Sequence, residues 1–273
     1  MIRQPAVAGQ FYSASPDTLT SDVARYLDSL ASPQPAIAVV SPHAGLMYSG
    51  HVAGAVYAKV SIPSTVILIG PNHSGIGPPL SLYPSGAWMI PGGAVRVDHG
   101  LVSAILAEFP RAEADTSAHL HEHCLEVQLP FLHRLRPDLH IVPIVLGHTP
   151  ETVYEEFGLC LARIIRDRAD RQAGEAWPLL VASTDLTHYE PDSIVRAKDH
   201  HAIGAVQRLD PAGLSAAVRQ HRITMCGFGA TLTILHTARA LGALSGTLIR
   251  YATSGDITGE HDQVVGYAGL TIT

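Results

Sequence analysis

Three apolar runs in this chain are each followed by a residue that can carry chemistry. The third residue after AIAVV, TVILIG and PLLVA is His43, His73 and Asp185, respectively. The runs are too apolar to alternate, which is typical of parallel strands covered on both faces. Ligands bind outside the carboxyl ends of the strands in an open α/β sheet. We therefore expect these three side chains to meet at one edge of such a sheet.

Helical and strand patterns alternate along the rest of the chain. The first expected helix has Ser15 as its N-cap and Pro16 as its first residue. The expected helices cover 16–31, 49–60, 99–109, 121–136, 151–171, 193–221 (split at Asp210) and 228–241. The expected strands are 36–41, 65–70, 139–147, 179–183, 246–251 and 264–272, with a short hairpin around Trp88. This order predicts an α/β fold, in which a central, largely parallel or mixed sheet is flanked by helices.

Composition narrows the class of protein. The 273 residues are 47% hydrophobic, which is enough for one domain (1–273) with a well-buried core. The net charge of −6 and the lack of a Lys/Arg run disfavour nucleic-acid binding. The three cysteines form no C-x-x-C pair, which favours a reducing compartment. No apolar stretch approaches the roughly 18–20 residues that cross a bilayer, and no signal peptide is evident. We expect a cytoplasmic protein that binds no membrane.

His43 and His73 are the first candidates for metal ligands. Each follows a strand, and Gly45 and Gly70 leave room for a close approach of backbone or ligand. Two histidines and a further donor are a metal-binding inventory. The alternative is that either histidine merely caps a neighbouring helix.

Asp185 and His188 lie three residues apart after the strand at 179–183. A carboxylate that accepts a hydrogen bond from an imidazole fixes its tautomer and raises its basicity. Such a pair predicts a general base. It is also compatible with a structural pair that tethers the following helix.

Cys226 and His123 are the remaining site candidates. Cys226 stands at the expected start of a helix, where the helix N-terminus lowers the pKa of a thiol; a buried, inert cysteine is the alternative. His123 and Glu126 are one turn apart on the helix expected over 121–136, so they could line a pocket. His148, Asp256 and other polar residues of the turns are explained by loop chemistry. The chain has no G-x-S-x-G elbow, Walker A loop or H-E-x-x-H motif.

Seven motifs, in order from about Pro5 to Gly269, carry a resemblance to a known family. They are PAVAGQFY, SPHAGLMYSG, GPNHSG, EHCLEVQLPFL, ASTDLTHYEP, CGFGA and YATSGD with VVGYAG. The sequence resembles the Memo family, whose prokaryotic members are known as AmmeMemoRadiSam system protein B. The resemblance implies a fold similar to that of the class III extradiol dioxygenases, which are non-haem iron enzymes.

The resemblance places His43, His73 and Cys226 on the family's metal positions. Asp185 and His188 fall on the adjacent polar pair. By the same resemblance Phe11 and Tyr48 fall on aromatic positions around the pocket. The dioxygenases hold iron with two histidines and a glutamate. A cysteine in the third position favours copper, zinc or a redox-active iron site, so dioxygenase activity does not carry over.

These observations predict a metal-dependent redox or oxygenase-like protein that holds non-haem iron or copper, with His188, oriented by Asp185, as base or proton shuttle. His123 would line the substrate pocket with Phe11 and Tyr48. Two alternatives stay open: a zinc-dependent hydrolase, and a non-catalytic module that binds a peptide or an anion. The resemblance also implies a pathway link to a radical SAM enzyme and an AMMECR-like protein.

Overall fold

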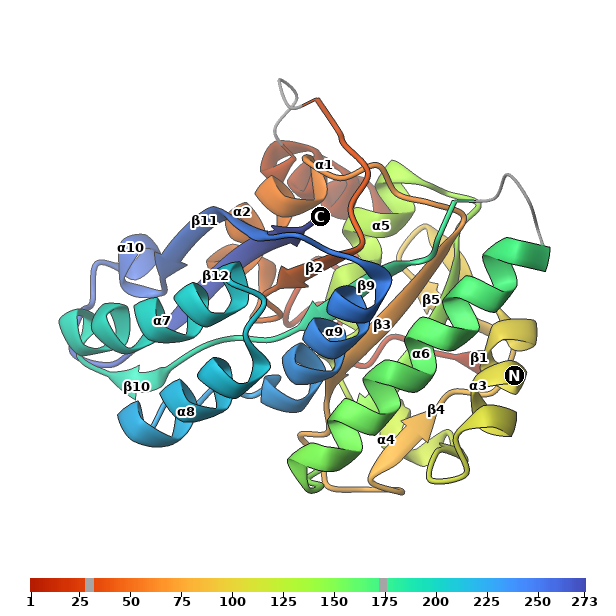
Figure 1. The fold of residues 1–273 in the computed structure, drawn as a ribbon. Coiled ribbons are helices and arrows are strands. Elements are labelled where there is room, and N and C mark those ends of the chain that lie inside the picture. Colours follow the sequence, from red (N-terminus) through yellow and green to blue (C-terminus); the bar gives the residue numbers. More distant parts are fainter. Residues whose placement is uncertain (28–31, 172–175) are drawn as a thin grey trace.

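A central mixed sheet organises the chain (Figure 1). The computed structural model describes residues 1–27, 32–171 and 176–273. Within them the 12 strands run in the order β1-β5-β6-β8-β3-β9-β2-β12-β10, with β11 paired to β12, and β4 to β7 and β8. The strands are β1 (Ile2–Arg3), β2 (Ala38–Ser41), β3 (Thr65–Pro71), β4 (Leu80–Leu82), β5 (Ala87–Ile90), β6 (Gly93–Val97), β7 (Glu113–Ala114), β8 (His140–Leu146), β9 (Leu179–Ser183), β10 (His188–Glu190), β11 (Gly246–Thr253) and β12 (Val264–Ile272).

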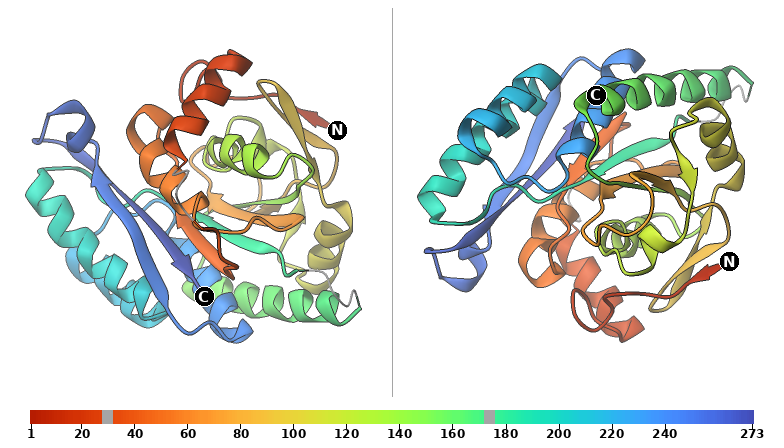
Figure 2. Two further views of the ribbon diagram at one scale, coloured as in Figure 1. Left: turned by 90° about the horizontal axis from the view of Figure 1, so that it is seen from above. Right: turned by 90° about the horizontal axis from the view of Figure 1, so that it is seen from below.

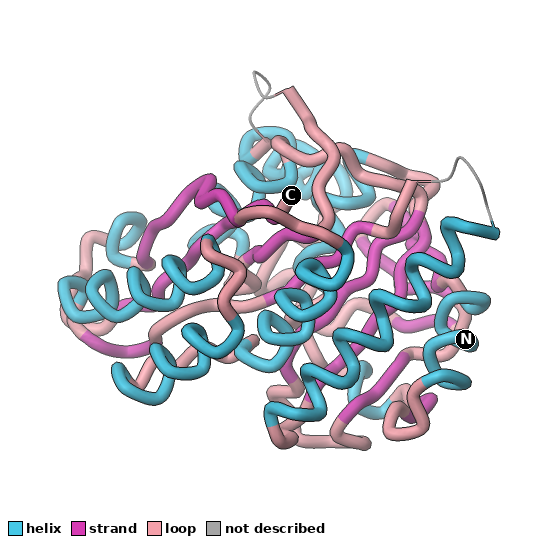
Figure 3. The backbone as a smooth tube through the Cα atoms, viewed as in Figure 1, coloured by secondary structure: helices cyan, strands magenta, loops and turns pink. Residues whose placement is uncertain are grey.

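Helices flank the sheet on both sides (Figures 2 and 3). They are α1 (Pro16–Tyr26), α2 (Leu46–Tyr57), α3 (His99–Glu108), α4 (Ser117–Leu120), η1 (Glu126–Gln128), α5 (Leu129–Leu135), α6 (Glu151–Arg171), α7 (Asp192–Gln207), α8 (Pro211–His221), α9 (Phe228–Leu241) and α10 (Gly255–Thr258). The packing of α2 and α9 against β2, with α1 on α2 and α6 on α9, builds the two outer layers. The predicted α/β class is confirmed.

The centre of the sheet explains the apolar runs. Strands β8, β3, β9 and β2 are mutually parallel neighbours, and every residue of β2, β3 and β9 is buried. A strand covered on both faces has no solvent-facing side, so its sequence does not alternate between apolar and polar residues. Residues from most of these elements pack into one main hydrophobic cluster. Among the described residues no helix is both long and apolar enough to cross a membrane.

One detail of the βαβ arrangement differs from the simplest expectation. The helix α2 connects β2 to β3, as predicted, but β9 lies between these two strands and pairs with both. The strand ends that precede His43 and His73 therefore flank the strand end that precedes Asp185. Long-range strand pairing, which local periodicity does not encode, decides this order.

Two helix boundaries differ from the expectation. Ser15 caps α1 with Pro16 at its first turn, as predicted, but the helix ends at Tyr26, where Leu27 is the C-cap; the predicted end near residue 31 lies outside the described residues. The helix expected from residue 49 begins earlier, at Leu46. Ser49 is not its cap, because its hydroxyl donates to the Ala44 carbonyl from inside the helix.

The helix expected over 121–136 is the main error. Residues 121–125 form a bend, two residues of irregular backbone and a turn, and helical structure begins only at η1 and continues through α5. Pro130 sits in the first turn of α5, where its missing N–H costs no hydrogen bond. The proline therefore marks the start of the helix, not a kink within it, and His123 lies on irregular backbone.

Candidate metal centre

The ends of three neighbouring strands build one site. His43 follows β2, Asp185 follows β9 and His73 follows β3, and β9 pairs with both of the others. His43 and Asp185 are buried, and the His73 side chain is 35% exposed. These three residues, which the apolar runs pointed to, line the same pocket. The expectation that they meet at one edge of the sheet is confirmed.

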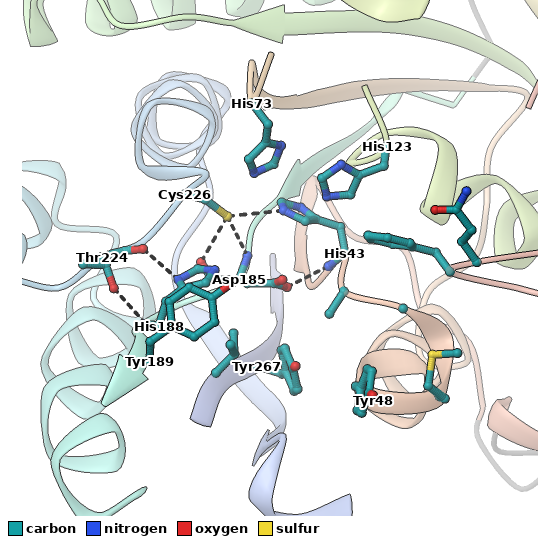
Figure 4. Close-up of a pocket in the computed structure, with 16 residues that line it drawn as sticks. His43, Tyr48, His73, His123, Asp185, His188, Tyr189, Thr224, Cys226 and Tyr267 are labelled. Carbon is teal, nitrogen blue, oxygen red and sulfur yellow. Dashed lines mark hydrogen bonds between the residues drawn. The ribbon is translucent and has the colours of Figure 1, made fainter. Parts of the chain in front are cut away.

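Three imidazoles converge there (Figure 4). One possible ligand atom from each of His43, His73 and His123 lies within 4.8 Å of the other two. The ring centroids are 5.3 Å apart for His43–His73, 5.4 Å for His43–His123 and 4.6 Å for His73–His123. His123 was expected to line the pocket, which it does, but the structure also gives it the position of a possible metal ligand.

Glu122 hydrogen-bonds the His73 ring and lies close to that of His123. Its Oε1 lies 2.8 Å from Nδ1 of His73 and 3.4 Å from Nδ1 of His123. The carboxylate also accepts the backbone N–H groups of His73, His123 and Cys124. Burial acts to raise the pKa of Glu122, but the hydrogen bonds and charge of His73 and the Cys124 N–H outweigh it and lower the pKa to about 2. A partner on Nδ1 leaves Nε2 of each ring for a metal.

Ser183 does the same for His43. Its hydroxyl donates to the Cys124 carbonyl at 2.7 Å, so its oxygen is an acceptor toward Nδ1 of His43 at 2.9 Å. His43 therefore carries its proton on Nδ1 and a lone pair on Nε2. Burial, and then the neighbouring rings of His123 and His73, hold the pKa of His43 well below its usual value. A neutral imidazole with a free Nε2 is the form that binds a metal.

Cys226 lies beside this lone pair. Its Sγ is 3.3 Å from Nε2 of His43 and accepts the backbone N–H of Asp185 at 3.2 Å. The residue precedes α9, whose N-cap is Gly227. The expected lowering of the thiol pKa is wrong for the metal-free protein: burial, and then the charge of Asp185, raise the pKa of Cys226 to about 12. Desolvation of a thiolate outweighs the helix N-terminus here.

Asp185 and His188 line the same pocket but have different hydrogen-bond partners. Oδ1 of Asp185 accepts the backbone N–H of His43 at 2.8 Å. Nδ1 of the His188 ring lies 3.0 Å from the Thr224 carbonyl, and the backbone N–H of His188 donates to the Thr224 hydroxyl at 2.7 Å. The predicted hydrogen-bonded pair is thus replaced by two separate anchors. Burial raises the pKa of Asp185 to about 6, while the charge of His188 is among the influences that lower it.

The pocket in front of the histidines has a volume of about 670 Å³. Phe11 and Tyr48, the two expected aromatic residues, both line it, and the Phe11 ring lies 4.8 Å from that of His123. The described lining contains no lysine or arginine and is completed by Gln10, Ala44, Gly45, Met47, Tyr189, Thr224, Val265 and Tyr267. A pocket of this size and composition is suited to a small, largely apolar ligand with a few polar groups.

Sequence reasoning missed three contributors. Glu122 stands between two histidines in HEHC, and this spacing was the available signal for it. Tyr189 is 71% exposed, has a left-handed φ of 59° and lies at the β-bulge between His188 and Glu190 of β10, which no local pattern indicates. Tyr267 sits on β12 within VVGYAG. In contrast, Glu126, which was considered for the site, pairs with Arg3 outside it.

Comparison with known proteins agrees with this arrangement of motifs. The model of the family described as Memo-like protein matches residues 3–271. The chain belongs to the Memo family. MEMO1 family proteins from Aquifex aeolicus and Methanothermobacter thermautotrophicus are 39% and 38% identical to it, over 98% and 99% of this chain and 98% and 100% of their own length. The matched segment of this Memo chain includes every residue of the candidate site.

A solved structure also shares the fold. It is the crystal structure of the uncharacterized protein JW3007 from Escherichia coli K12, with a TM-score of 0.55, 14% identity, and coverage of 86% of this chain and 99% of that one. At this identity the likeness concerns the fold alone.

Proposed function

We propose that this Memo-family protein is a metal-dependent redox or oxygenase-like protein whose ion is held by His43, His73 and Cys226, with His123 as an additional donor. The observation that carries the proposal is the convergence of three imidazoles within 4.8 Å in a pocket at the strand ends. Nδ1 of His43 and Nδ1 of His73 each have a hydrogen-bond partner, and Nδ1 of His123 faces the Glu122 carboxylate. Rings oriented in this way are typical of metal ligands.

The donor set favours particular metals. Imidazole suits iron, copper and zinc, and a thiolate shifts the preference toward soft or redox-active ions. The Cys226 thiol fits this role because Nε2 of His43 and the Asp185 N–H both face its sulfur. A bound cation deprotonates a coordinating thiol, so the raised pKa of the free thiol is compatible with a thiolate ligand. Iron or copper is the proposed cofactor.

The proposed acid–base group is His188. Its ring lies at the pocket wall, and the Thr224 carbonyl fixes the proton on Nδ1, so Nε2 is the basic atom. Asp185 lines the same pocket and holds the backbone of His43. A ring held by one backbone acceptor can take a proton from a ligand or return it. The bound metal would supply Lewis-acid or redox chemistry beside it.

A zinc-dependent hydrolase is the second candidate. Three histidines around an open position are the donor set of several catalytic zinc sites, and His43, His73 and His123 supply such a set. A zinc-bound water needs a base close by, and His188 would serve. The exposed Tyr48 and Tyr189 at the pocket also keep a peptide-binding module among the outcomes that a test must separate.

We also propose that the protein works in a pathway with other proteins. The resemblance to AmmeMemoRadiSam system protein B supports a functional link to a radical SAM enzyme and an AMMECR-like protein. The ligand in the pocket would then be a small molecule or a peptide that such a pathway produces or consumes.

Elemental analysis of anaerobically purified protein tests the proposal. We expect near-stoichiometric iron or copper, with oxygen uptake to follow on the loaded protein. Zinc alone, together with oxygen-independent cleavage of an ester or amide, would favour hydrolysis. Protein that stays metal-free after reconstitution but binds a peptide at this pocket would support the binding module. His200→Ala serves as a control, because this exposed residue on α7 does not line the pocket.

A further inference from the structure

The N-terminal segment is fastened to the loop that carries His123. Arg3 is fully buried, and its Nε and NH2 donate to the carbonyls of His119 at 2.7 Å and Glu122 at 2.6 Å. Its guanidinium also lies over the Trp88 ring, 4.1 Å from the centroid, and pairs with the Glu126 carboxylate at 2.6 Å. A buried arginine with all these partners fixes the backbone whose carbonyls accept its hydrogen bonds.

Glu126 is the second half of this connection. Its carboxylate is fully buried and accepts the N–H groups of Ala6 at 2.8 Å and Val7 at 3.0 Å, as well as the Tyr12 hydroxyl at 2.5 Å. Together with Arg3, these donors occupy both oxygens. Glu126 is therefore unavailable to a metal, although it belongs to the same motif as His123.

Phe11 reaches the site itself. Its ring packs on that of His123 with centroids 4.8 Å apart, and its carbonyl accepts the Leu46 N–H at 2.7 Å. Leu46 begins α2, three residues after His43. The same segment thus contacts the backbone near one candidate ligand and the ring of another.

The backbone at His123 needs such support. His123 lies on irregular backbone: its carbonyl accepts the Val127 N–H, but its own N–H bonds only the side chain of Glu122. The interaction of His123 with Glu122 is 3.4 Å long, against 2.8 Å for His73. Irregular backbone shifts more readily than a helix or strand, and a metal site tolerates little displacement of its ligands.

We propose that residues 3–12 are an integral part of the metal centre, and that Glu126 and Phe11 are positioning residues that hold His123 toward His43 and His73. This inference rests on the proposed function, because it concerns the same site. Neither residue touches the metal position. Both act through His123.

A double-mutant cycle tests this role. In Glu126→Gln, an amide NH2 replaces one acceptor oxygen. This NH2 would face N–H or O–H donors that bind the carboxylate in the wild type, so donor would meet donor. We expect the zinc dissociation constant of the folded protein, measured by competition with a chromophoric chelator, to rise by about tenfold or more. The cobalt(II) absorption spectrum should change with it. In a His123→Ala background, Glu126→Gln should add less than about a twofold change, because the residue through which it acts is gone.

Two further variants keep the test decisive. Phe11→Leu leaves the carboxylate network intact and should weaken zinc binding in the same His123-dependent way. Asp98→Ala removes the N-cap of α3 near the start of β3, at the opposite end of that strand from His73, and should lower the melting temperature without changing zinc binding. An equal loss of zinc affinity in Asp98→Ala, or a full loss from Glu126→Gln in the His123→Ala background, would overturn the inference.

A metal-free readout separates this inference from the proposed function. The imidazole NMR signals of His123 in the apoprotein should shift in Glu126→Gln and Phe11→Leu but not in Asp98→Ala. If the wild type bound no metal, the proposed function would fail while these signals still reported on positioning. Unchanged His123 signals in both variants would contradict the positioning role.

Discussion

The Sγ atom of Cys226 lies 3.3 Å from Nε2 of His43, across a separation of 183 residues in the chain. Ser183 holds the His43 proton on Nδ1, so the lone pair of Nε2 faces the sulfur. Burial raises the pKa of the thiol to about 12 and lowers that of the imidazole well below its usual value. Without a metal, both groups are therefore neutral near pH 7, and metal binding to this pair must release the thiol proton.

Replacing Cys226 with serine tests that coupling. We expect Cys226→Ser to bind zinc or copper at least tenfold more weakly, which is about 1.4 kcal/mol of binding free energy. It should also release about one proton fewer per metal bound at pH 7, because the hydroxyl stays protonated. Calorimetry in two buffers of different ionisation enthalpy measures both quantities. Identical proton release in the two proteins would argue against a thiolate ligand.

Glu122→Gln addresses the orientation of the histidines. The carboxylate accepts hydrogen bonds from His73 and from three backbone N–H groups, and an amide offers only one acceptor oxygen. We expect metal affinity to fall by about 10- to 100-fold and the free energy of unfolding to fall by about 1–3 kcal/mol. Metal titration and urea denaturation measure the two effects. Full metal affinity in a destabilised variant would restrict Glu122 to a structural role.

His188 is expected to affect turnover and not metal content. His188→Gln should retain stoichiometric metal while kcat falls by about 10²- to 10⁴-fold, the usual contribution of a general acid or base. Thr224→Val removes the hydroxyl that accepts the His188 N–H but keeps the carbonyl that holds its ring, so a smaller loss should follow. Elemental analysis and steady-state kinetics decide the matter. Loss of metal in His188→Gln would make this residue a ligand instead.

Acid should destabilise the fold through His119. Burial, and then the charge of Arg3, lower the pKa of this ring to about 3, against about 6.5 in the unfolded chain. Between these values the unfolded state binds the extra proton, so the contribution is fully present above pH 6.5 and is lost as the pH falls toward 3. The difference amounts to roughly 4–5 kcal/mol at about 1.4 kcal/mol per pKa unit.

Urea denaturation of wild type and His119→Gln between pH 7 and 4 measures this effect. The variant should be less stable at pH 7, since Ser81 loses its 2.9 Å partner, but should lose less stability on acidification. Tyr26→Phe, away from the site, serves as a control for the pH dependence of the rest of the fold. Parallel pH profiles for His119→Gln and wild type would contradict the assignment.

Local patterns predicted much of this architecture. The buried strands β2, β3 and β9 follow from runs too apolar to alternate, and α6 and α9 have the predicted bounds. The rule that strand ends share one edge brought His43, His73 and Asp185 together. The features that local patterns do not determine are those fixed by long-range contacts.

Arg3 illustrates this limit. Its hydrogen bonds to His119, Glu122 and Glu126 each span more than 100 residues, and nothing near it in the chain indicates that its charge is buried. His123 illustrates another limit. Leucines at helical spacing predicted a helix through 121–125, but there the Glu122 side chain bonds the N–H groups of His123 and Cys124, and helical structure begins only at Glu126. The pocket, with His123 in its lining, was therefore predicted in outline, while the place of His123 among the possible metal ligands and the residues that support it were not.

X-ray absorption spectroscopy of the zinc-reconstituted protein tests the central claim most directly. We expect imidazole nitrogens at about 2.0–2.1 Å and one sulfur at about 2.3 Å, with the sulfur shell lost in Cys226→Ser and the bound metal lost in His43→Ala and His73→Ala. A shell of oxygen atoms without imidazole scattering, or stoichiometric metal retained in both histidine variants, would contradict a metal centre at this site.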